Sequence, residues 1–278
     1  MHTAGNRMSR RNFLRAGTVA ALATPMIARA ADGDPYKGLK VGVHTYSLRA
    51  FKLDEALAMT RELEVKYLSV NPIHIPLKST ASELAEAHSK IADAGLTLLE
   101  AGVINVSKDI AITRSAFEYA KALGLKTLVA KAALDSYNTL DNLLRDYDVR
   151  VAVHNHGPSD TYKTPDDILM AIEDHDRRIG ACVDIGHYER AGVKAGDALR
   201  ALKGHIYDVH IKDVSKGDEG GKPVVIGTGV IDIADVLKYL LGSNYGDGVM
   251  LEYEADEKNP MPGMKKSFEF IRATLAKI

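Results

Sequence analysis

The stretch VAVHNHGP, Val151–Pro158, begins like a buried β-strand and ends with two histidines before a Gly-Pro pair. Its first three residues are typical of a strand in a parallel sheet that is covered on both faces. Such an apolar strand has no structural need for His154 and His156 at its end. We therefore interpret the stretch as a strand that leads into a functional site.

The chain repeats this pattern of an apolar run followed by an amphipathic stretch with the 3.6-residue period of a helix. Strands that alternate with helices indicate βαβ units around a parallel sheet. Eight such units in about 250 residues favour a single (β/α)8 TIM barrel over a doubly wound sheet. We assign this domain to residues 31–278. The predicted strands are Leu39–Thr45, Tyr67–Asn71, Leu96–Ala101, Thr127–Lys131, Val149–Asn155, Ile179–Asp184, Ile206–Ile211 and Gly248–Glu252.

Local signals support the predicted helices. Thr164–Asp167 supplies a capping hydroxyl, then a proline and two acids, which is the order typical of a helix start. After the fourth strand, Thr139–Tyr147 leaves room for only a short helix.

Residues 1–30 have the features of an export signal. Arg10 and Arg11 are followed by Phe13 and Leu14, an apolar run over Ala16–Ala28 and a small-x-small cleavage site after Ala30. This segment resembles a twin-arginine signal peptide, which implies the twin-arginine export machinery as a partner and a periplasmic location. The apolar run is shorter than the roughly 20 residues that span a bilayer, so we expect no stable membrane anchor.

Charge and cysteine content argue against a nucleic-acid-binding protein and against a protein stabilised by internal disulfides. The chain has 36 Lys and Arg against 37 Asp and Glu, and residues 1–30 contain five arginines and no acid. Removal of that segment leaves 31 bases against 37 acids, a net charge of −6. This excess of acids argues against a nucleic-acid partner. The single cysteine, Cys182, cannot form an internal disulfide and is expected to be a buried core thiol.

Histidines and acids gather at the predicted strand ends. Six of the ten histidines lie at or just beyond a strand C-terminus: His44, His74, His154, His156, His187 and His210. Four carboxylates join them: Glu100, Asp184, Glu252 and Glu254. A lone histidine at such a place is usually a hydrogen-bonded loop residue. In a TIM barrel, however, all strand ends meet at one face, where functional residues collect. The cluster therefore predicts a divalent metal site.

The alternation of side chains along each strand selects the metal ligands. Residues two apart share a face, as His210 and Lys212 do in DVHIKD and as Glu252 and Glu254 do in LEYE. For the fifth strand the alternation favours His154 over His156, although a bulge would reverse this choice. Imidazole together with carboxylate suits Mn, Fe, Co or Zn better than Ca. The predicted ligands are His154, Asp184, His210 and Glu252.

Four motifs resemble those of the xylose isomerase-like TIM barrel family of sugar (phosphate) isomerases and epimerases. They are CVDIGHYERAG (Cys182–Gly192), VHIKDV (Val209–Val214), GTGVIDI (Gly227–Ile233) and MLEYE (Met250–Glu254). The resemblance covers nearly all of residues 31–278. It implies metal-binding roles for Asp184, His210 and Glu252, and a place close to the substrate for His187.

The end of the fifth strand departs from this family pattern. Many relatives have Glu-Asn-His there, and the glutamate both binds metal and acts on the substrate proton. This chain has His154-Asn155-His156 instead. A metal-bound imidazole is a poor substitute for a carboxylate base, so the two-carboxylate epimerase mechanism does not carry over directly.

The resemblance implies a metal-dependent sugar isomerase or epimerase that acts through an enediolate on a sugar or keto-sugar. The candidate catalytic residues are Glu252, Glu254, His187, Lys212, Lys131 and Glu100, with Lys212 as an alternative partner for the developing oxyanion. The candidate substrate-binding residues are His44, His74, His156 and His187.

Three alternatives remain open at this point. A lyase that eliminates the aglycone from 3-keto-glycosides would use the same metal site. A non-catalytic carbohydrate-binding barrel would retain only the substrate pocket. A nuclease of the endonuclease IV type shares the barrel but needs a basic face for DNA. In addition, the Gly227–Gly229 turn is a weak phosphate-loop signal, and Asp232 is more typical of a helix cap. A homodimer through the helix-covered outside is compatible with the fold.

Overall fold

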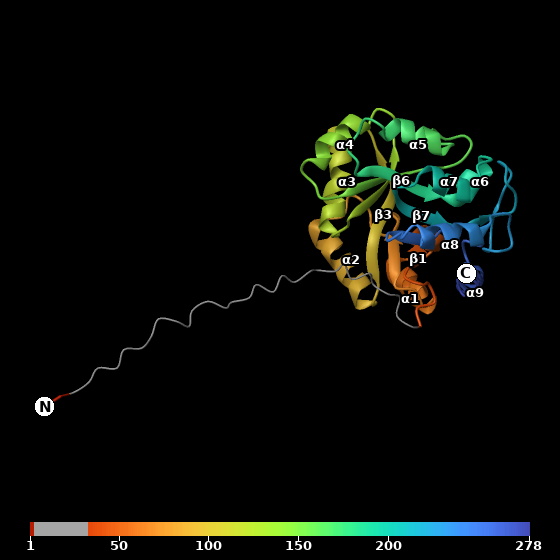
Figure 1. Cartoon of the computed structure of the whole chain (residues 1–278), viewed down its shortest axis with the longest axis horizontal. Coiled ribbons are helices and arrows are strands. Elements are labelled where there is room, and N and C mark those ends of the chain that lie inside the picture. Colours follow the sequence, from red (N-terminus) through yellow and green to blue (C-terminus); the bar gives the residue numbers. More distant parts are fainter. Residues whose placement is uncertain (3–32) are drawn as a thin grey trace.

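The computed structural model describes residues 1–2 and 33–278. Eight parallel strands, each followed by at least one helix or turn, lie at its centre (Figure 1). They are β1 (Lys40–His44), β2 (Tyr67–Val70), β3 (Thr97–Val106), β4 (Thr127–Ala132), β5 (Arg150–His154), β6 (Ile179–Asp184), β7 (Ile206–Ile211) and β10 (Gly248–Leu251).

The strands form a closed barrel in the order β1-β10-β7-β6-β5-β4-β3-β2. Every neighbouring pair is parallel, and the ring closes where Val41 pairs with Val249 of β10. The predicted single (β/α)8 TIM barrel is therefore confirmed. The predicted export signal, residues 1–30, lies outside the described residues from position 3 onward.

The helices cover the outside of this barrel. They are η1 (Thr45–Leu48), α1 (Leu53–Glu62), α2 (Ala81–Asp93), α3 (Ile110–Ala122), α4 (Tyr137–Leu144), α5 (Pro165–Ile172), α6 (Ile185–Arg190), α7 (Ala195–Ala201), α8 (Ile233–Gly242) and α9 (Met261–Leu275). The loop after β7 adds an antiparallel pair, β8 (Asp213–Val214) with β9 (Pro223–Val224). Among residues 1–2 and 33–278, no helix is both long enough and apolar enough to cross a membrane.

Two details differ from the sequence-based expectation. The third strand runs to Val106 and not to Ala101, so Glu100 lies inside β3. Two helices, α6 and α7, follow β6 where one was expected. The short helix after the fourth strand is present as α4, and Thr164 caps α5 by accepting a hydrogen bond from the Asp167 amide.

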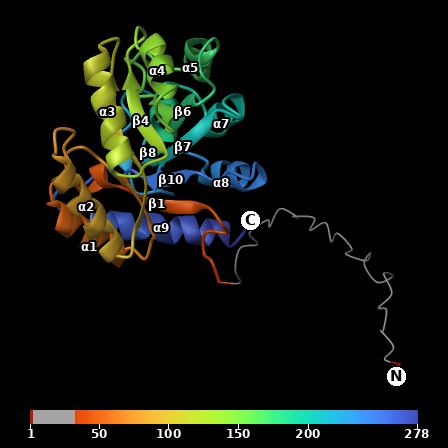
Figure 2. The ribbon, with the colours of Figure 1, turned by 90° about the vertical axis from the view of Figure 1, so that its left-hand side faces the viewer.

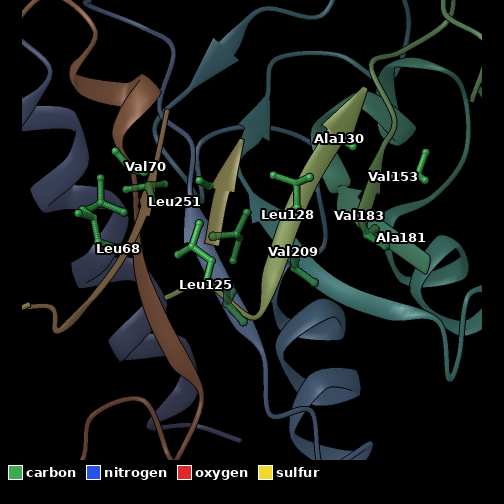
Figure 3. Close-up of a cluster of buried hydrophobic side chains, with 14 of the residues drawn as sticks. Leu68, Val70, Leu125, Leu128, Ala130, Val153, Ala181, Val183, Val209 and Leu251 are labelled. Atoms are coloured by element: carbon green, nitrogen blue, oxygen red, sulfur yellow. The ribbon is translucent and has the colours of Figure 1, made fainter. Parts of the chain in front are cut away.

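Alternate residues of the strands face the helix layer. Leu128 and Ala130 of β4, and Val183 of β6, belong to one large apolar core together with the inner faces of the helices (Figure 3). The residues between them face the barrel interior, where Val129, Ala152 and Cys182 form a separate small cluster. The functional side chains extend from the same interior faces.

The last helix covers the place where the ring closes (Figure 2). Arg272 of α9 donates a hydrogen bond to the hydroxyl of Tyr36, just before β1. Lys265 of α9 pairs with Glu62 at the end of α1 at 2.5 Å. The first and last segments of the barrel are therefore held together by side chains as well as by the strand pairing.

Closure also depends on a close approach between β1 and β2. Gly42 of β1 pairs with Tyr67, and a Cβ atom added at Gly42 would overlap the backbone carbonyl of Tyr67. We expect Gly42→Ala to lower the free energy of unfolding by about 1–3 kcal/mol, because a backbone atom cannot turn aside as a side chain can. Urea unfolding followed by circular dichroism measures this change.

Gly242→Ala is the matched control, because an added Cβ atom at the end of α8 has no neighbour within 4 Å. It should be neutral or slightly stabilising. Equal stability of the Gly42 variant and the unmodified protein would contradict the steric explanation.

Candidate metal centre

Four side chains from adjacent strand ends converge inside the mouth of the barrel. His154 ends β5, Asp184 ends β6, His210 belongs to β7, and Glu252 directly follows β10. All four are buried, and each offers one ligand atom that lies within 4.8 Å of the other three. The structure thus brings together the four residues that the strand alternation selects, which we call the ligand set.

The ligand atoms face one another. Nε2 of His154 is 3.1 Å from Nδ1 of His210, although β6 lies between their strands. The same Nδ1 is 3.2 Å from Oε2 of Glu252, and His154 Nε2 is 3.6 Å from Oδ2 of Asp184. The same Oδ2 lies 2.9 Å from Nζ of Lys212. Two imidazoles and two carboxylates that converge in this way fit a divalent ion such as Mn, Fe, Co or Zn.

Asp184 owes its orientation to its neighbours. Its Oδ1 caps α6 by accepting a hydrogen bond from the His187 amide at 2.8 Å. The side chain of Asn155 bonds both backbone groups of Asp184, at 3.0 Å to the carbonyl and 2.9 Å from the amide. The bond from the His187 amide occupies Oδ1, and the Asn155 bonds fix the backbone, so that Oδ2 is directed toward the cluster. Asn155 is therefore a structural member of the site that the sequence analysis did not assign.

Lys212 places an ammonium group among the acids of the site. Its Nζ is 2.9 Å from Oδ2 of Asp184, 2.7 Å from Oε2 of Glu252 and 2.6 Å from Oε1 of Glu254. Burial opposes the charge, but the three carboxylates outweigh burial and raise the pKa of Lys212 well above its usual value. Lys212 is consequently an ammonium group near neutral pH, able to donate a proton or a hydrogen bond but not to act as a base.

His210 is held between acids on both sides. Burial opposes its protonation, but Glu252 and Asp208 outweigh burial and raise the pKa of His210 to about 10. Its ring also stacks on His44, with centroids 4.5 Å apart. Burial, with the charge of His210 as the next cause, lowers the pKa of His44 to about 3, and His44 contacts Ser69 Oγ through Nδ1 at 3.0 Å. His44 is thus a neutral ring packed against the ligand set.

Two further histidines line the mouth beside β5 and β6. Nδ1 of His156 is 3.1 Å from Oδ2 of Asp160, and Nζ of Lys131 lies 3.9 Å from the same oxygen. Burial, followed by the neighbouring His154, lowers the pKa of His156 to about 4. Burial also lowers the pKa of His187, against the opposing effect of Asp184. Both imidazoles are neutral near pH 7 and can accept a proton.

Two of the sequence-selected residues lie apart from this cluster. His74 is on the loop after β2, where its Nε2 contacts the Leu48 carbonyl at 3.3 Å. Glu100 was expected at a strand end, but β3 continues beyond it and its register partner is Thr127, the first residue of β4. Glu100 therefore faces the lower half of the barrel, near the start of β10 at Gly248.

Asp208 lies beneath the ligand set and was missed by the sequence analysis. Its Oδ2 is 3.2 Å from Nε2 of His210 and accepts a bond from the Cys182 thiol at 3.0 Å. Burial, together with the Asp208 charge, raises the pKa of Cys182, which keeps this core thiol protonated. The signal for Asp208 was present in the sequence, because DVHIKD places it two residues before His210 and hence on the same face.

The Gly227–Gly229 turn does not offer a phosphate loop. The amides of Gly227 and Gly229 both donate to Oδ2 of Asp213 at 2.9 Å. A carboxylate of the chain itself therefore uses the amides that would hold an anion. Asp232 accepts a hydrogen bond from the Asp235 amide at 2.9 Å and caps α8, as its position in the sequence indicates.

Residues 45–274 match the family described as xylose isomerase-like TIM barrel. The chain belongs to this family. It is 28% identical over 153 residues to an inosose dehydratase from Clostridium botulinum (strain Eklund 17B / Type B), covering 49% of this chain and 51% of that protein. The chain thus spans about half the length of the curated relatives it matches.

Solved structures confirm the fold. An L-ribulose 3-epimerase aligns with a TM-score of 0.68 and 20% identity, over 86% of this chain and 95% of the other. The probable 3-DHS dehydratase AsbF from Bacillus anthracis aligns with a TM-score of 0.68 and 14% identity, over 83% and 98%. At these identities the likeness concerns the barrel alone.

The buried Glu100 predicts a pH effect on stability. Burial, then the charge of Asp208, holds the pKa of Glu100 well above the value of about 4.3 in an unfolded chain. The folded state keeps a proton that the unfolded state loses, so the free energy of unfolding falls as pH rises above about 4.3. Glu100→Gln should remove this part of the slope, which amounts to at most ~1.4 kcal/mol per pH unit.

Urea unfolding between about pH 5 and about pH 8 measures the slope. Glu269→Gln, which neutralises an exposed carboxyl on α9, is the control and should leave it unchanged. An identical slope in the Glu100 variant and the unmodified protein would show that Glu100 is not protonated in the folded state.

Proposed function

We propose that the protein is a divalent-metal-dependent carbon–oxygen lyase that acts on a keto-sugar or keto-glycoside. The observation that carries the proposal is the convergence of His154, Asp184, His210 and Glu252 beside the Lys212–Glu254 ion pair. A divalent ion in that ligand set polarises a substrate carbonyl and makes the neighbouring C–H bond more acidic.

Groups that can take up or donate a proton lie on two sides of the ligand set. Glu254 and Lys212 lie at the ends of β10 and β7, whereas His156 and His187 follow β5 and β6. Glu254 is the carboxylate placed to remove a proton next to the carbonyl, since Lys212 is already protonated. The ammonium group of Lys212 then faces the oxygen on which negative charge develops.

Elimination completes the reaction without a second base. The C–H bond breaks as the proton passes to Glu254, a C=C bond forms, and the C–O bond at the adjoining carbon breaks. The departing oxygen takes the proton that Glu254 received and leaves as water or as an alcohol, such as the aglycone of a 3-keto-glycoside, which restores the Glu254 carboxylate. The dehydratase names of the curated relatives support this order of events for a protein of the same family.

Isomerisation or epimerisation is the second candidate. It begins with the same proton removal but ends with return of a proton to carbon, and the neutral imidazoles of His156 and His187 favour it. The replacement of a family glutamate by His154 counts against the two-carboxylate form of this reaction. The net charge of −6 after removal of residues 1–30 counts against the nuclease.

The ligand set predicts the metal content of its variants. Protein purified without chelator or metal resin should contain roughly one Mn, Fe, Co or Zn ion per chain by plasma mass spectrometry. Asp184→Ala and His210→Ala should each lose the ion, because each removes a buried ligand. Glu254→Gln should retain the ion but lose turnover of 3-keto-glycosides by about 10²-fold or more.

His74→Ala, which changes a histidine outside the cluster, is the control and should retain both metal and turnover. Metal retained by both ligand variants would reject the site. Metal bound by the unmodified protein with isomerised product and no eliminated alcohol would reject the lyase and favour the second candidate.

We also propose, from the sequence motif alone, that the twin-arginine pathway exports the protein to the periplasm. Replacing Arg10 and Arg11 together by Lys should cause the uncleaved precursor to accumulate in the cytoplasm, as measured by immunoblots of cell fractions. Replacing Arg7 and Arg15 by Lys is the charge-matched control. Unchanged processing of the Arg10 and Arg11 variant would contradict this route.

A further inference from the structure

The two ring nitrogens of His210 face different surroundings. Nδ1 faces the ligand set, at 3.1 Å from His154 Nε2 and 3.2 Å from Glu252 Oε2. Nε2 points away from it, toward the lower barrel. Oδ2 of Asp208 lies 3.2 Å from Nε2. The ring therefore lies between a metal-binding side and a single buried acid.

Asp208 has no exposure to solvent. Its Oδ2 contacts both the His210 ring, at 3.2 Å, and the Cys182 thiol, at 3.0 Å. The N–H at Nε2 is not fully aligned with this oxygen, so the contact is an ion pair with hydrogen-bond separation. Glu100 is a third neighbour, whose pKa is raised by burial and by the charge of Asp208. The carboxylate of Asp208 is thus held among buried side chains and restrains the His210 ring.

His154, the other imidazole of the set, has no such partner. Its Nδ1 is 3.3 Å from Nδ1 of His156, a side chain that is 31% exposed. One imidazole ligand is thus held by a buried acid, and the other by a partly exposed ring that can turn. Of the two imidazole rings, that of His210 is therefore held more firmly in its orientation.

A carboxylate behind an imidazole has a known physical effect on metal binding. It accepts the N–H of one ring nitrogen, which determines the tautomer, directs the other nitrogen's lone pair at the metal and makes that lone pair more basic. We propose that Asp208 is a positioning residue that holds Nε2–H of His210 and so makes Nδ1 the metal-binding atom. This inference rests on the metal site of the proposed function.

The first test is the affinity of the intact protein for Zn²⁺, measured by competition with a coloured chelator. Asp208→Asn keeps the shape of the side chain but removes its charge, and should weaken Zn²⁺ binding about 10- to 100-fold. Asp141→Asn is the matched control, because Asp141 pairs with His175 at 2.7 Å on the outside of the barrel. It should leave the affinity within about threefold, inside the scatter expected for a distant site.

The outcomes separate the two proposals. Zn²⁺ binding by the unmodified protein with equal affinity in the Asp208 variant overturns the positioning role and leaves the metal site standing. An equal loss in both variants also overturns it, since the effect would not be specific to His210. Absence of Zn²⁺ binding by the unmodified protein overturns both.

A second measurement begins with the unmodified protein, so its first result does not depend on the folding of a variant. In Zn²⁺-loaded protein labelled with ¹⁵N-histidine, His210 should have a slowly exchanging proton on Nε2 and none on Nδ1. A proton on Nδ1, or zinc bound through Nε2, would overturn the proposal. In the Asp208 variant the Nε2 proton should exchange faster and move upfield, a change that a purely structural defect at Asp208 would not produce.

Discussion

The carboxylates of Asp184 and Glu252 are buried inside the barrel, where an unpaired charge costs several kcal/mol. Lys212 places one ammonium group within 3 Å of both carboxylates. His210, whose pKa is raised to about 10, adds a second positive charge beside these two acids and Asp208. These three buried acids outnumber the two buried cations, and the four side chains of the ligand set converge around this excess of negative charge.

The exchange of glutamate for His154 changes the charge of the ligand set. Two carboxylates and two neutral imidazoles balance a divalent ion, whereas a third carboxylate would leave the set with one excess negative charge. In the proposed metal centre a neutral set would withdraw less of the ion's positive charge and therefore leave it a stronger Lewis acid. The same exchange would leave one carboxylate base fewer at the mouth. Both effects would favour bond polarisation over proton shuttling between two carboxylates.

The sequence predicted the barrel, and the convergence of the four candidate ligands, because both depend on local patterns. Apolar runs mark strands, and the alternation along each strand places His154, Asp184 and His210 on interior faces. Glu100 was misplaced because Gly102 is typical of a strand end, whereas β3 continues through it over the mostly β-branched residues up to Val106. Contacts between strands, such as Cys182 with Asp208 or Asn155 with Asp184, join segments that are distant in the sequence, so strand alternation indicates the face but not the partner.

The pairing of β1 with β10 has a consequence for how the chain acquires its structure. The two strands are joined in the ring although more than two hundred residues separate them, as in the pair Val41 and Val249. We expect a loop of that length to close late in folding, because the conformational entropy lost on closure is offset only when both strands are present to pair. Until Gly248–Leu251 has been synthesised, β1 and β7 present unpaired edges that can pair with other chains. A chain shortened at its end by some thirty residues would therefore be an aggregation hazard as well as an inactive barrel.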